Sequence, residues 1–357
     1  MFDGFARQWT PLLPSAEITT TPRRIKVAGE DLVAWRPQPD ALPGVLLDRC
    51  PHRGVSLALG KRTDDGSLAC AFHGWEFRPD GGCAHIPFNP DAARSRLGAT
   101  ALPVRETAGF VWVFTGFAGE GSDPATDASD SNDPHDVSDP GTPSTPSDPS
   151  DLGDLGEPNV HEQLGDPGLT RHDHWEEWDC HWTRAMENML DFPHLPFIHR
   201  TTIGRFVLSK MHRDSRLHLT VTDTAYGFAL ESRVDDHPPS AALRWYRPHG
   251  MVLDTTPDPR IMRLHVWCVP IDDGHTRMLL TSVRNFAQNP AASLGINRFN
   301  LTVLRQDRAV VESSAPAVVP EGPVERSVPS DKPTLTFRTW YHRTLAGSSV
   351  PDPRVRR

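Results

Sequence analysis

Two close pairs of cysteine and histidine constrain the fold of this chain more than any other sequence feature. The first pair is Cys50 and His52, and the second, after 17 intervening residues, is Cys70 and His73. Thiolates and imidazoles at such short spacings are typical of metal sites whose ligands lie in tight turns. Five cysteines in 357 residues do not otherwise fit a disulfide-stapled secreted scaffold. We therefore expect the first third of the chain to fold around a metal centre.

The way the ligands are paired distinguishes a zinc site from an iron–sulfur cluster. A zinc finger pairs cysteine with cysteine and histidine with histidine, whereas each pair here contains one of each. In a Rieske centre one iron takes both cysteines and the other both histidines, so each loop must supply one cysteine and one histidine. Pro51, Gly54 and Gly74 permit tight turns whose amides can point at sulfur. The ligands thus favour a Rieske 2Fe–2S cluster, with zinc as the alternative.

The first region resembles the Rieske domain of the bacterial ring-hydroxylating and O-demethylating oxygenases. The resemblance is carried by the ligand loops at 50–54 and 70–75 and by the segments 7–11, 81–87 and 109–113. It implies that a 2Fe–2S cluster is held by Cys50, His52, Cys70 and His73. The other three cysteines have no matching partner pattern, and we expect buried, inert thiols at Cys83, Cys180 and Cys268.

A second group of candidate ligands lies between residues 188 and 199. Asn188, Asp191 and His194 are spaced three apart and so share one face of a helix. His199 lies five residues beyond His194, but the two prolines flanking His194 break the helix and let the chain bring His199 back. Two neutral imidazoles need a third, anionic ligand to hold Fe(II) on one face and leave the other open for O₂.

The candidate third ligand is Asp307, on an amphipathic helix predicted over 293–313. The apolar stripe predicted to share its face consists of Ile296, Phe299, Val303, Leu304, Val310 and Val311. A carboxylate on an apolar stripe is costly to bury unpaired, and a metal removes that cost. The alternative is an ion pair between Asp307 and Arg305 or Arg308.

Segments 188–199 and 306–312 extend the resemblance to the catalytic half of the same oxygenases. The resemblance implies a helix-grip (START-like) domain with mononuclear Fe(II) bound by His194, His199 and Asp307. It also implies a homotrimer in which the cluster of one subunit faces the iron of its neighbour. Asp191 would bridge a cluster histidine, His52 or His73, to His194; the alternative is an ordinary polar helix residue. Asn188 would be either a polar group near the iron or a residue that only orients Asp191.

Composition divides the chain into two folded regions. Residues 118–157 carry 11 acidic residues and no Lys or Arg, with too little apolar surface to fold. We expect a disordered linker there, acting as a spacer or, alternatively, as an acidic docking segment. Without it, 37 basic residues face 35 acidic ones, so the net charge of −9 belongs to this linker. The predicted domains are a Rieske domain over 1–117 and a catalytic domain over 158–357.

The fold class predicted is α+β: an all-β first domain, then an antiparallel sheet around a long C-terminal helix. Strands are expected at 25–27, 31–36, 44–48, 67–71 and 109–115, and later at 217–222, 225–233, 261–270 and 277–285. A strand leading into a helix is expected over 172–184, with the helix over 184–190. No segment is apolar enough for a membrane span or a signal peptide, and the charge argues against nucleic acid. A cytoplasmic location follows by default.

The resulting functional prediction is the terminal oxygenase of a Rieske system, which uses O₂ and electrons from a ferredoxin or flavin reductase. The substrate is expected to be hydrophobic and natural-product-like, and to be hydroxylated or oxidatively cyclised. One alternative is O-demethylation of an aromatic acid, as in enzymes similar to vanillate demethylase. Two others are a Rieske electron carrier without chemistry of its own and a non-catalytic binder of hydrophobic ligands.

Overall fold

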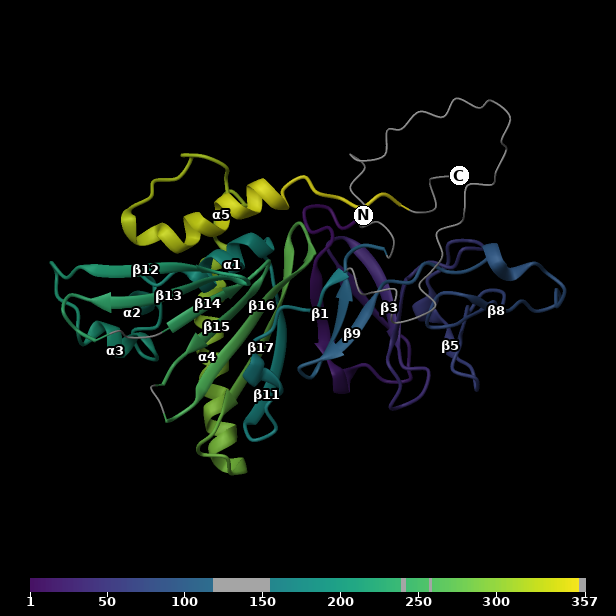
Figure 1. Ribbon diagram of the computed structural model, residues 1–357, viewed down its shortest axis with the longest axis horizontal. Helices are drawn as coiled ribbons and strands as arrows, with labels where there is room; N and C mark the ends of the chain where they lie inside the picture. Colours follow the sequence, from purple (N-terminus) through teal and green to yellow (C-terminus); the bar gives the residue numbers. More distant parts are fainter. Residues whose placement is uncertain (118–154, 239–241, 257–258, 353–357) are drawn as a thin grey trace.

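The computed structural model describes residues 1–117, 155–238, 242–256 and 259–352. The first region is built mainly from short antiparallel strands arranged in three small sheets. Figure 1 shows these strands in purple and blue on one side of an elongated molecule. The first sheet has the order β1 (Trp9–Pro14), β10 (Phe110–Phe114), β9 (Val104–Thr107). The second sheet has the order β2 (Arg23–Val27), β3 (Glu30–Trp35), β4 (Gly44–Leu47). The third has the order β5 (Lys61–Arg62), β6 (Leu68–Ala69), β7 (Glu76–Phe77), β8 (Cys83–His85).

The second region is one seven-stranded antiparallel sheet with helices against it. Its strands, in sheet order, are β11 (Thr170–Trp178), β17 (His275–Arg284), β16 (Met262–Asp272), β15 (Gly250–Asp254), β14 (Ala242–Tyr246), β13 (Gly227–Val234) and β12 (Leu217–Thr224). The helices are α1 (Trp182–Leu190), α2 (Leu195–Ile198), α3 (Gly204–Leu208), α4 (Pro290–Glu312) and α5 (Lys332–Thr344). Short 3-10 helices lie at Ser15–Glu17, Leu57–Leu59, Arg94–Arg96, Glu162–Gly165 and Pro329–Asp331.

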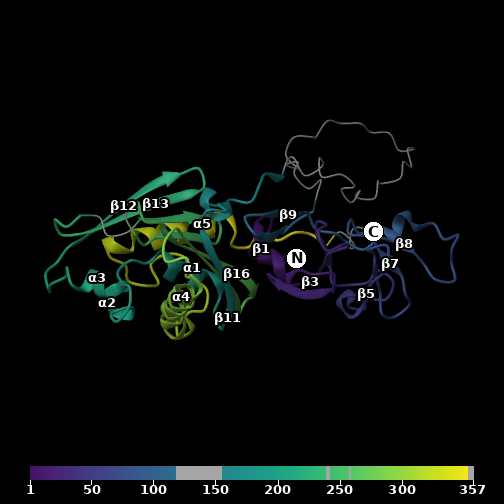
Figure 2. The same ribbon diagram turned by 90° about the horizontal axis from the view of Figure 1, so that it is seen from below.

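The large sheet is covered on both faces at β16 and β17. Along β17, Leu280 faces α4 and α1, whereas Leu279 points to the opposite face because side chains alternate along a strand. On that opposite face Leu279 and Trp267 pack against Phe110 and Trp112 of the first region. Figure 2 shows α1 and α4 on the other side of the sheet. The catalytic candidates therefore lie between the sheet and α4, on the face that the first region leaves free.

The α+β class, the all-β first region and the sheet around a long helix are confirmed. Sequence patterns missed five strands of the first region and two strands and three helices of the second, and α4 begins three residues before the predicted start. The missed elements are β1, β5, β7, β8, β9, β14, β15, α2, α3 and α5. The predicted apolar stripe was partly wrong. The buried face of α4 is Asn300, Val303, Leu304, Asp307 and Val311, a strict helical repeat. Phe299 and Val310 are instead 44% and 47% exposed, because they flank that face.

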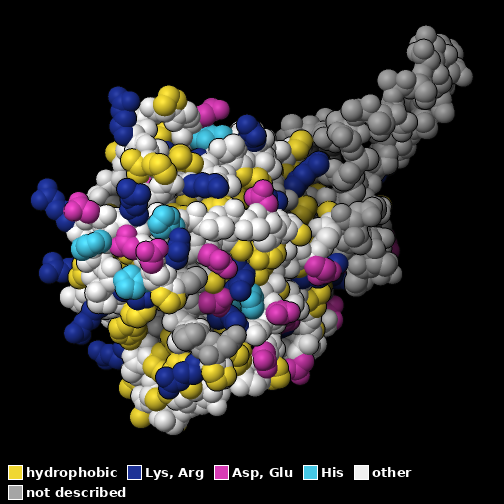
Figure 3. All heavy atoms as spheres, turned by 60° about the vertical axis from the view of Figure 1, so that its left-hand side comes forward, with side chains coloured by type: hydrophobic (Ala, Val, Ile, Leu, Met, Phe, Trp, Pro, Cys, Tyr) yellow, Lys and Arg dark blue, Asp and Glu magenta, His cyan; other side chains and the backbone are white. Residues whose placement is uncertain are grey.

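Most of the predicted linker, 118–154, lies outside the described residues. Its last three residues are described, and the carbonyls of Leu155 and Gly156 both accept a hydrogen bond from the Trp9 indole at 3.1 Å. Figure 3 shows the end of the second region, where Lys and Arg are interspersed with acidic and hydrophobic side chains. Within the described residues, no helix has the length and apolarity needed to cross a bilayer.

Candidate functional site

The two Cys/His loops of the first region have the same backbone design. In each loop the cysteine amide donates to the carbonyl five residues later, at 2.8 Å in both. The cysteine carbonyl accepts from a glycine four residues later, Gly54 at 2.8 Å and Gly74 at 3.0 Å. Both glycines have a positive φ, +72° and +69°, which strains any residue with a Cβ. The repeated turn places Cys50 and Cys70 as structural equivalents.

The cysteines of these loops face inwards and the histidines outwards. Cys50 and Cys70 are only 3% and 4% exposed, whereas His73 is exposed and His52 half-buried. The rings of His52 and His73 lie 4.7 Å apart between centroids, and His52 stacks on Trp75 at 4.6 Å. Burial, reinforced by the neighbouring Cys70, raises the pKa of the Cys50 thiol to about 11. Buried thiols are costly to ionise alone, so a cation that takes them as thiolates fits this position.

The four side chains lie as one pair of cysteines and one pair of histidines, which fits a two-iron cluster. The Cys50 and Cys70 thiols interact with each other, and the His52 and His73 rings lie 4.7 Å apart. A Rieske cluster binds one iron through two cysteines and the other through two histidines, so this division of the side chains matches it.

The second group of candidates converges on one point although it comes from three elements. Asp191 follows the last residue of α1, and its Oδ2 accepts from the His194 amide at 3.1 Å. The short helix α2 then carries the chain to His199. Asp307, on α4, places Oδ1 3.6 Å from Nε2 of His194 and 3.1 Å from Nε2 of His199. The ligand atoms of His194, His199 and Asp307 all lie within 4.8 Å of one another.

Each histidine is oriented through its other ring nitrogen. Nδ1 of His194 lies 3.2 Å from Oδ2 of Asp191, and Nδ1 of His199 lies 2.9 Å from Oε1 of Gln306. The same Gln306 oxygen accepts from the Thr202 hydroxyl at 2.8 Å. Both Nε2 atoms are thereby left facing Asp307, as in protein metal sites where an outer partner fixes the tautomer. The sequence analysis did not identify Gln306 as a positioning residue. The only signal for it in the sequence is that it directly precedes Asp307.

Asp307 is a buried carboxylate with an unsatisfied oxygen. It is 4% exposed, and no hydrogen bond is aligned on Oδ1 despite the nearby ring nitrogens. The alternative pairing with arginine is not present, since Arg305 bonds Glu176 and Arg308 bonds Glu312. Burial alone would lower the pKa of His199, but Asp307 and Gln306 together raise that pKa above its usual value. Two free ring nitrogens and an unsatisfied carboxylate oxygen form the donor set that suits a mononuclear Fe(II) site.

A cavity opens beside these three residues, between α4 and the sheet. The empty space between its walls is about 690 Å³ when the open solvent at its mouth is counted with it. Asn188 lines this cavity, and its side-chain nitrogen is buried without a partner, so the structure shows no hydrogen bond from it to Asp191. One aromatic side chain near the candidate ligands, Phe192, lines the cavity. Phe197 is 65% exposed and Trp267 packs on the opposite face of the sheet.

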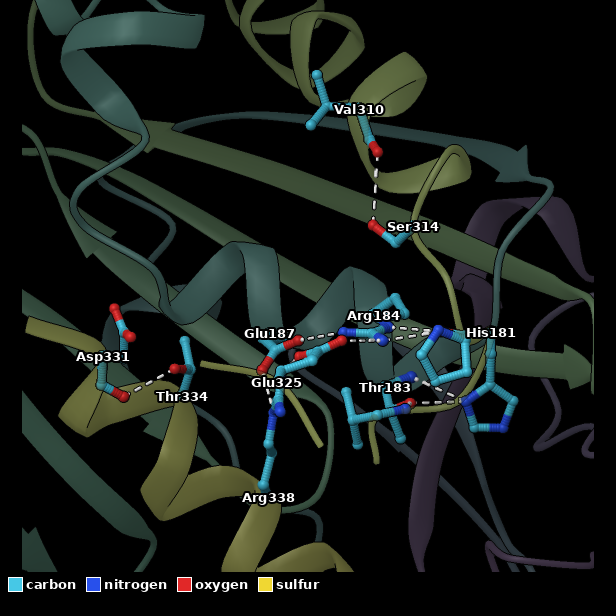
Figure 4. Close-up of polar contacts among 12 residues, drawn as sticks. His181, Thr183, Arg184, Glu187, Val310, Ser314, Glu325, Asp331, Thr334 and Arg338 are labelled. Carbon is cyan, nitrogen blue, oxygen red and sulfur yellow. Dashed lines mark hydrogen bonds and ion pairs between the residues drawn. The ribbon is translucent and has the colours of Figure 1, made fainter. Parts of the chain in front are cut away.

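The helix that carries Asn188 is anchored at its start by buried polar contacts (Figure 4). The His181 imidazole caps α1 by accepting from the Thr183 amide at 3.3 Å. Arg184 bonds Glu187 at 3.1 Å and Glu325 at 2.8 Å. Arg338 of α5 bonds the same two carboxylates. The described C-terminal segment therefore holds α1 in place without supplying a candidate ligand.

The three remaining cysteines are buried, as predicted: Cys83, Cys180 and Cys268. Burial raises the pKa of Cys180 to about 11 and that of Cys268 well above its usual value. Such thiols stay protonated, so they have little thiolate with which to react.

Comparison with known families assigns both regions. Residues 8–101 match the Rieske [2Fe-2S] domain, and residues 178–347 match the vanillate O-demethylase oxygenase C-terminal domain. The oxygenase subunit of 3-chlorobenzoate-3,4-dioxygenase from Comamonas testosteroni is 42% identical over 118 residues, which are 32% of this chain and 27% of that protein. The first curated relatives are thus matched over only about a quarter of their length.

A longer match is weaker in identity. The oxygenase subunit of tert-butanol monooxygenase / tert-amyl alcohol desaturase from Aquincola tertiaricarbonis is 24% identical over 99% of this chain and 75% of its own length.

Solved structures share the fold over almost the whole chain. Pseudomonas putida CBB5 NdmA superposes with a TM-score of 0.72 at 22% identity, covering 94% of this chain and 89% of its own. Dicamba monooxygenase bound to 3,6-dichlorosalicylic acid gives a TM-score of 0.69 at 19% identity, covering 94% and 96%. At such identities the likeness concerns the fold. With a Rieske domain followed by an oxygenase domain of the vanillate O-demethylase type, this chain belongs to the Rieske non-heme iron oxygenases.

Proposed function

We propose that this chain is the terminal oxygenase of a Rieske system and that it oxidises a hydrophobic small molecule with O₂. The observation that carries this proposal is the convergence of His194, His199 and Asp307 beside an apolar cavity, with Oδ1 of Asp307 unsatisfied. When bound, a 2Fe–2S cluster and a mononuclear iron together supply the two electrons that O₂ activation requires. A simple electron carrier would need neither the triad nor the cavity.

In this proposal the first region holds the cluster and contacts its electron donor. Cys50, His52, Cys70 and His73 hold the cluster, and the outward-facing histidines present it to other proteins. Its electron donor would be a ferredoxin or flavin reductase. Phe72, 59% exposed next to His73, offers such a donor an apolar contact. The free thiols agree with a reducing, cytoplasmic compartment.

Asp191 is proposed to link the two centres between subunits. Within one chain the cluster loops lie at one end and α2 at the other, as Figures 1 and 2 show. A cluster so far from its own triad fits a homotrimer in which the neighbouring subunit supplies the electron. Asp191 is 27% exposed and already bonds His194, so part of its carboxylate is accessible to a histidine of another copy.

The test of the oxygenase proposal combines metal analysis with turnover. Purified protein should contain the 2Fe–2S cluster plus one further iron per chain, and should show the EPR signal of a mixed His/Cys-ligated cluster when reduced. Because the His194 side chain is 15% exposed, water can replace Asp191 at its Nδ1, so Asp191→Ala loaded with excess iron should keep both metals and lose substrate-dependent O₂ uptake. The matched control is Asp179→Ala, which changes an exposed aspartate near the start of α1. Protein that binds zinc alone, or has no iron beyond the cluster, would refute the proposal.

Two types of oxidation are candidates for this site. Hydroxylation or oxidative cyclisation of a bulky, natural-product-like molecule is favoured by the apolar lining of the cavity. O-demethylation is favoured by the matched C-terminal domain family and by a 26% identity over 201 residues to the oxygenase component of dicamba O-demethylase from Stenotrophomonas maltophilia. Product analysis after incubation with a methoxyarene separates them, because demethylation releases formaldehyde.

A further inference from the structure

We propose that Asn300 and Ser232 set the substrate specificity of this cavity by selecting a neutral, mostly apolar molecule with one hydrogen-bonding oxygen. This inference rests on the proposed function, since it concerns the substrate of the same site. Aromatic carboxylates would then be excluded as substrates.

The floor of the cavity is apolar and formed by paired residues of neighbouring strands. One row runs across four strands through Leu230, Leu243, Leu253 and Leu264, each directly opposite the next. A second row consists of Met251, Val266 and Leu280. All seven line the cavity. The rows form a continuous apolar surface against which a ring system can lie.

Among the residues that the structure describes, no Lys or Arg lines the cavity, and the carboxylates that do are those of the metal-site candidates, Asp191 and Asp307. An unpaired carboxylate moved from water into such surroundings loses its solvation without gaining a counter-charge. The buried guanidinium of Arg284 lies on the same sheet face as Leu280, four residues along β17. Arg284 bonds Ser293 and the carbonyl of Ala287, and it is not part of the cavity lining.

Besides the Asn188 amide and Oδ1 of Asp307 near the metal-site candidates, two more buried polar groups on the cavity wall have no partner among the described residues. Asn300 is 4% exposed and its side-chain nitrogen makes no hydrogen bond; Ser232 is 1% exposed and its hydroxyl makes none. Both residues line the cavity. A buried polar group without a partner costs folding free energy, so a ligand oxygen that bonds it recovers part of that cost.

The position of Asn300 defines which end of the ligand it holds. Asn300 and Asp307 lie on the same face of α4, seven residues apart. Two helical turns separate them by about 10 Å along the axis. An amide at that distance cannot act on the atom that is oxidised beside Asp307. It is suited to bind an oxygen at the remote end of the substrate and so to fix which carbon approaches the metal site.

The test uses three probes whose heavy atoms have the same arrangement, a naphthalene ring with a three-atom planar substituent. They are 2-acetylnaphthalene (neutral, with a carbonyl), 2-isopropenylnaphthalene (the same shape without oxygen) and 2-naphthoate (anionic). Binding to the oxidised holoprotein is measured by calorimetry without reductase, so that no turnover occurs. We expect the ketone to bind roughly fivefold tighter than the alkene and about 100-fold tighter than the carboxylate.

Asn300→Leu should abolish the preference for the ketone over the alkene and leave alkene binding unchanged or stronger. Its fold is not threatened, because an apolar residue of similar size replaces an unsatisfied buried amide. Ser232→Ala should reduce the preference by a smaller factor. The matched control is Thr302→Val, an exposed position on the same helix outside the cavity.

Equal or tighter binding of 2-naphthoate, an unchanged ketone preference in Asn300→Leu, or no binding of any probe would overturn this inference. Iron content and O₂ uptake are measured on the same preparations. Iron-free protein that still shows the Asn300-dependent preference would contradict the proposed function alone. Iron-loaded, active protein that prefers the carboxylate would contradict the specificity inference alone.

Discussion

Replacing Gln306 by leucine should weaken metal binding at a site to which Gln306 supplies no ligand. Its Oε1 accepts bonds from His199 Nδ1 at 2.9 Å and from Thr202 Oγ1 at 2.8 Å. His199 is 1% exposed, so in Gln306→Leu its Nδ1–H finds neither acceptor nor water. Loss of such an outer partner typically costs 10–100-fold in metal affinity, or about 1.4 to 2.8 kcal/mol. The ring would also be free to turn Nε2 away from Asp307.

The assay is a Co(II) titration of protein from which the mononuclear metal has been removed and the cluster retained. Gln306→Glu is the matched control, because a carboxylate keeps the acceptor for His199. We expect the glutamate variant to bind Co(II) within about threefold of the parent and the leucine variant to fall by the larger factor. The EPR signal of the cluster should be the same in all three proteins. Equal affinity of the leucine variant and the parent would refute the positioning role.

Three further results follow from the geometry. Asp307→Asn should lower the iron content by about one atom per chain while the visible spectrum of the cluster stays unchanged; a normal iron content would remove Asp307 from the ligand set. Arg184→Met should lower the free energy of unfolding, measured by urea titration, by about 2 kcal/mol, because Arg184 is 7% exposed and bonds two carboxylates. The control is Arg343→Met, at an exposed position. Burial lowers the pKa of His181 to about 4 and those of His249 and His265 to about 3. Below about pH 6.5, the pKa of a histidine in the unfolded chain, the unfolded chain therefore binds more protons at these three positions than the folded protein does. The free energy of unfolding is thus highest above that pH and decreases as the pH falls. The three histidines together should lower the free energy of unfolding by about 4 kcal/mol at pH 5.5 relative to pH 8. A free energy of unfolding that is the same at both pH values would contradict this reasoning.

Most candidate ligands of the two proposed centres could be identified from the sequence because their spacing is local. Two short Cys/His loops and the proline-broken segment around His194 carry their geometry in a few consecutive residues. Asp307 was predictable for a different reason, since a lone carboxylate in an apolar helical repeat needs a partner. The structure brings these residues together; that they bind iron is still a prediction.

The missed elements depend on contacts between distant residues. β14 and β15 are five residues each and owe their position to pairing with β13 and β16, which no local pattern specifies. Phe299 and Val310 were assigned to the apolar face of α4 because residue type alone does not reveal which flank of a helix is covered. Asn300 was overlooked for the converse reason, since a polar residue on the buried face looks like a break in the pattern.

The ion pairs between α1 and the C-terminal segment set the smallest fragment that can work as an enzyme. Every candidate ligand precedes residue 308, so a protein shortened after α4 would still contain the complete donor set. Such a fragment would leave Arg184 and Glu187 without Glu325 and Arg338, and α1 would lose its support beside the cavity. Possession of the ligands is thus a poor guide to where a functional domain can be cut.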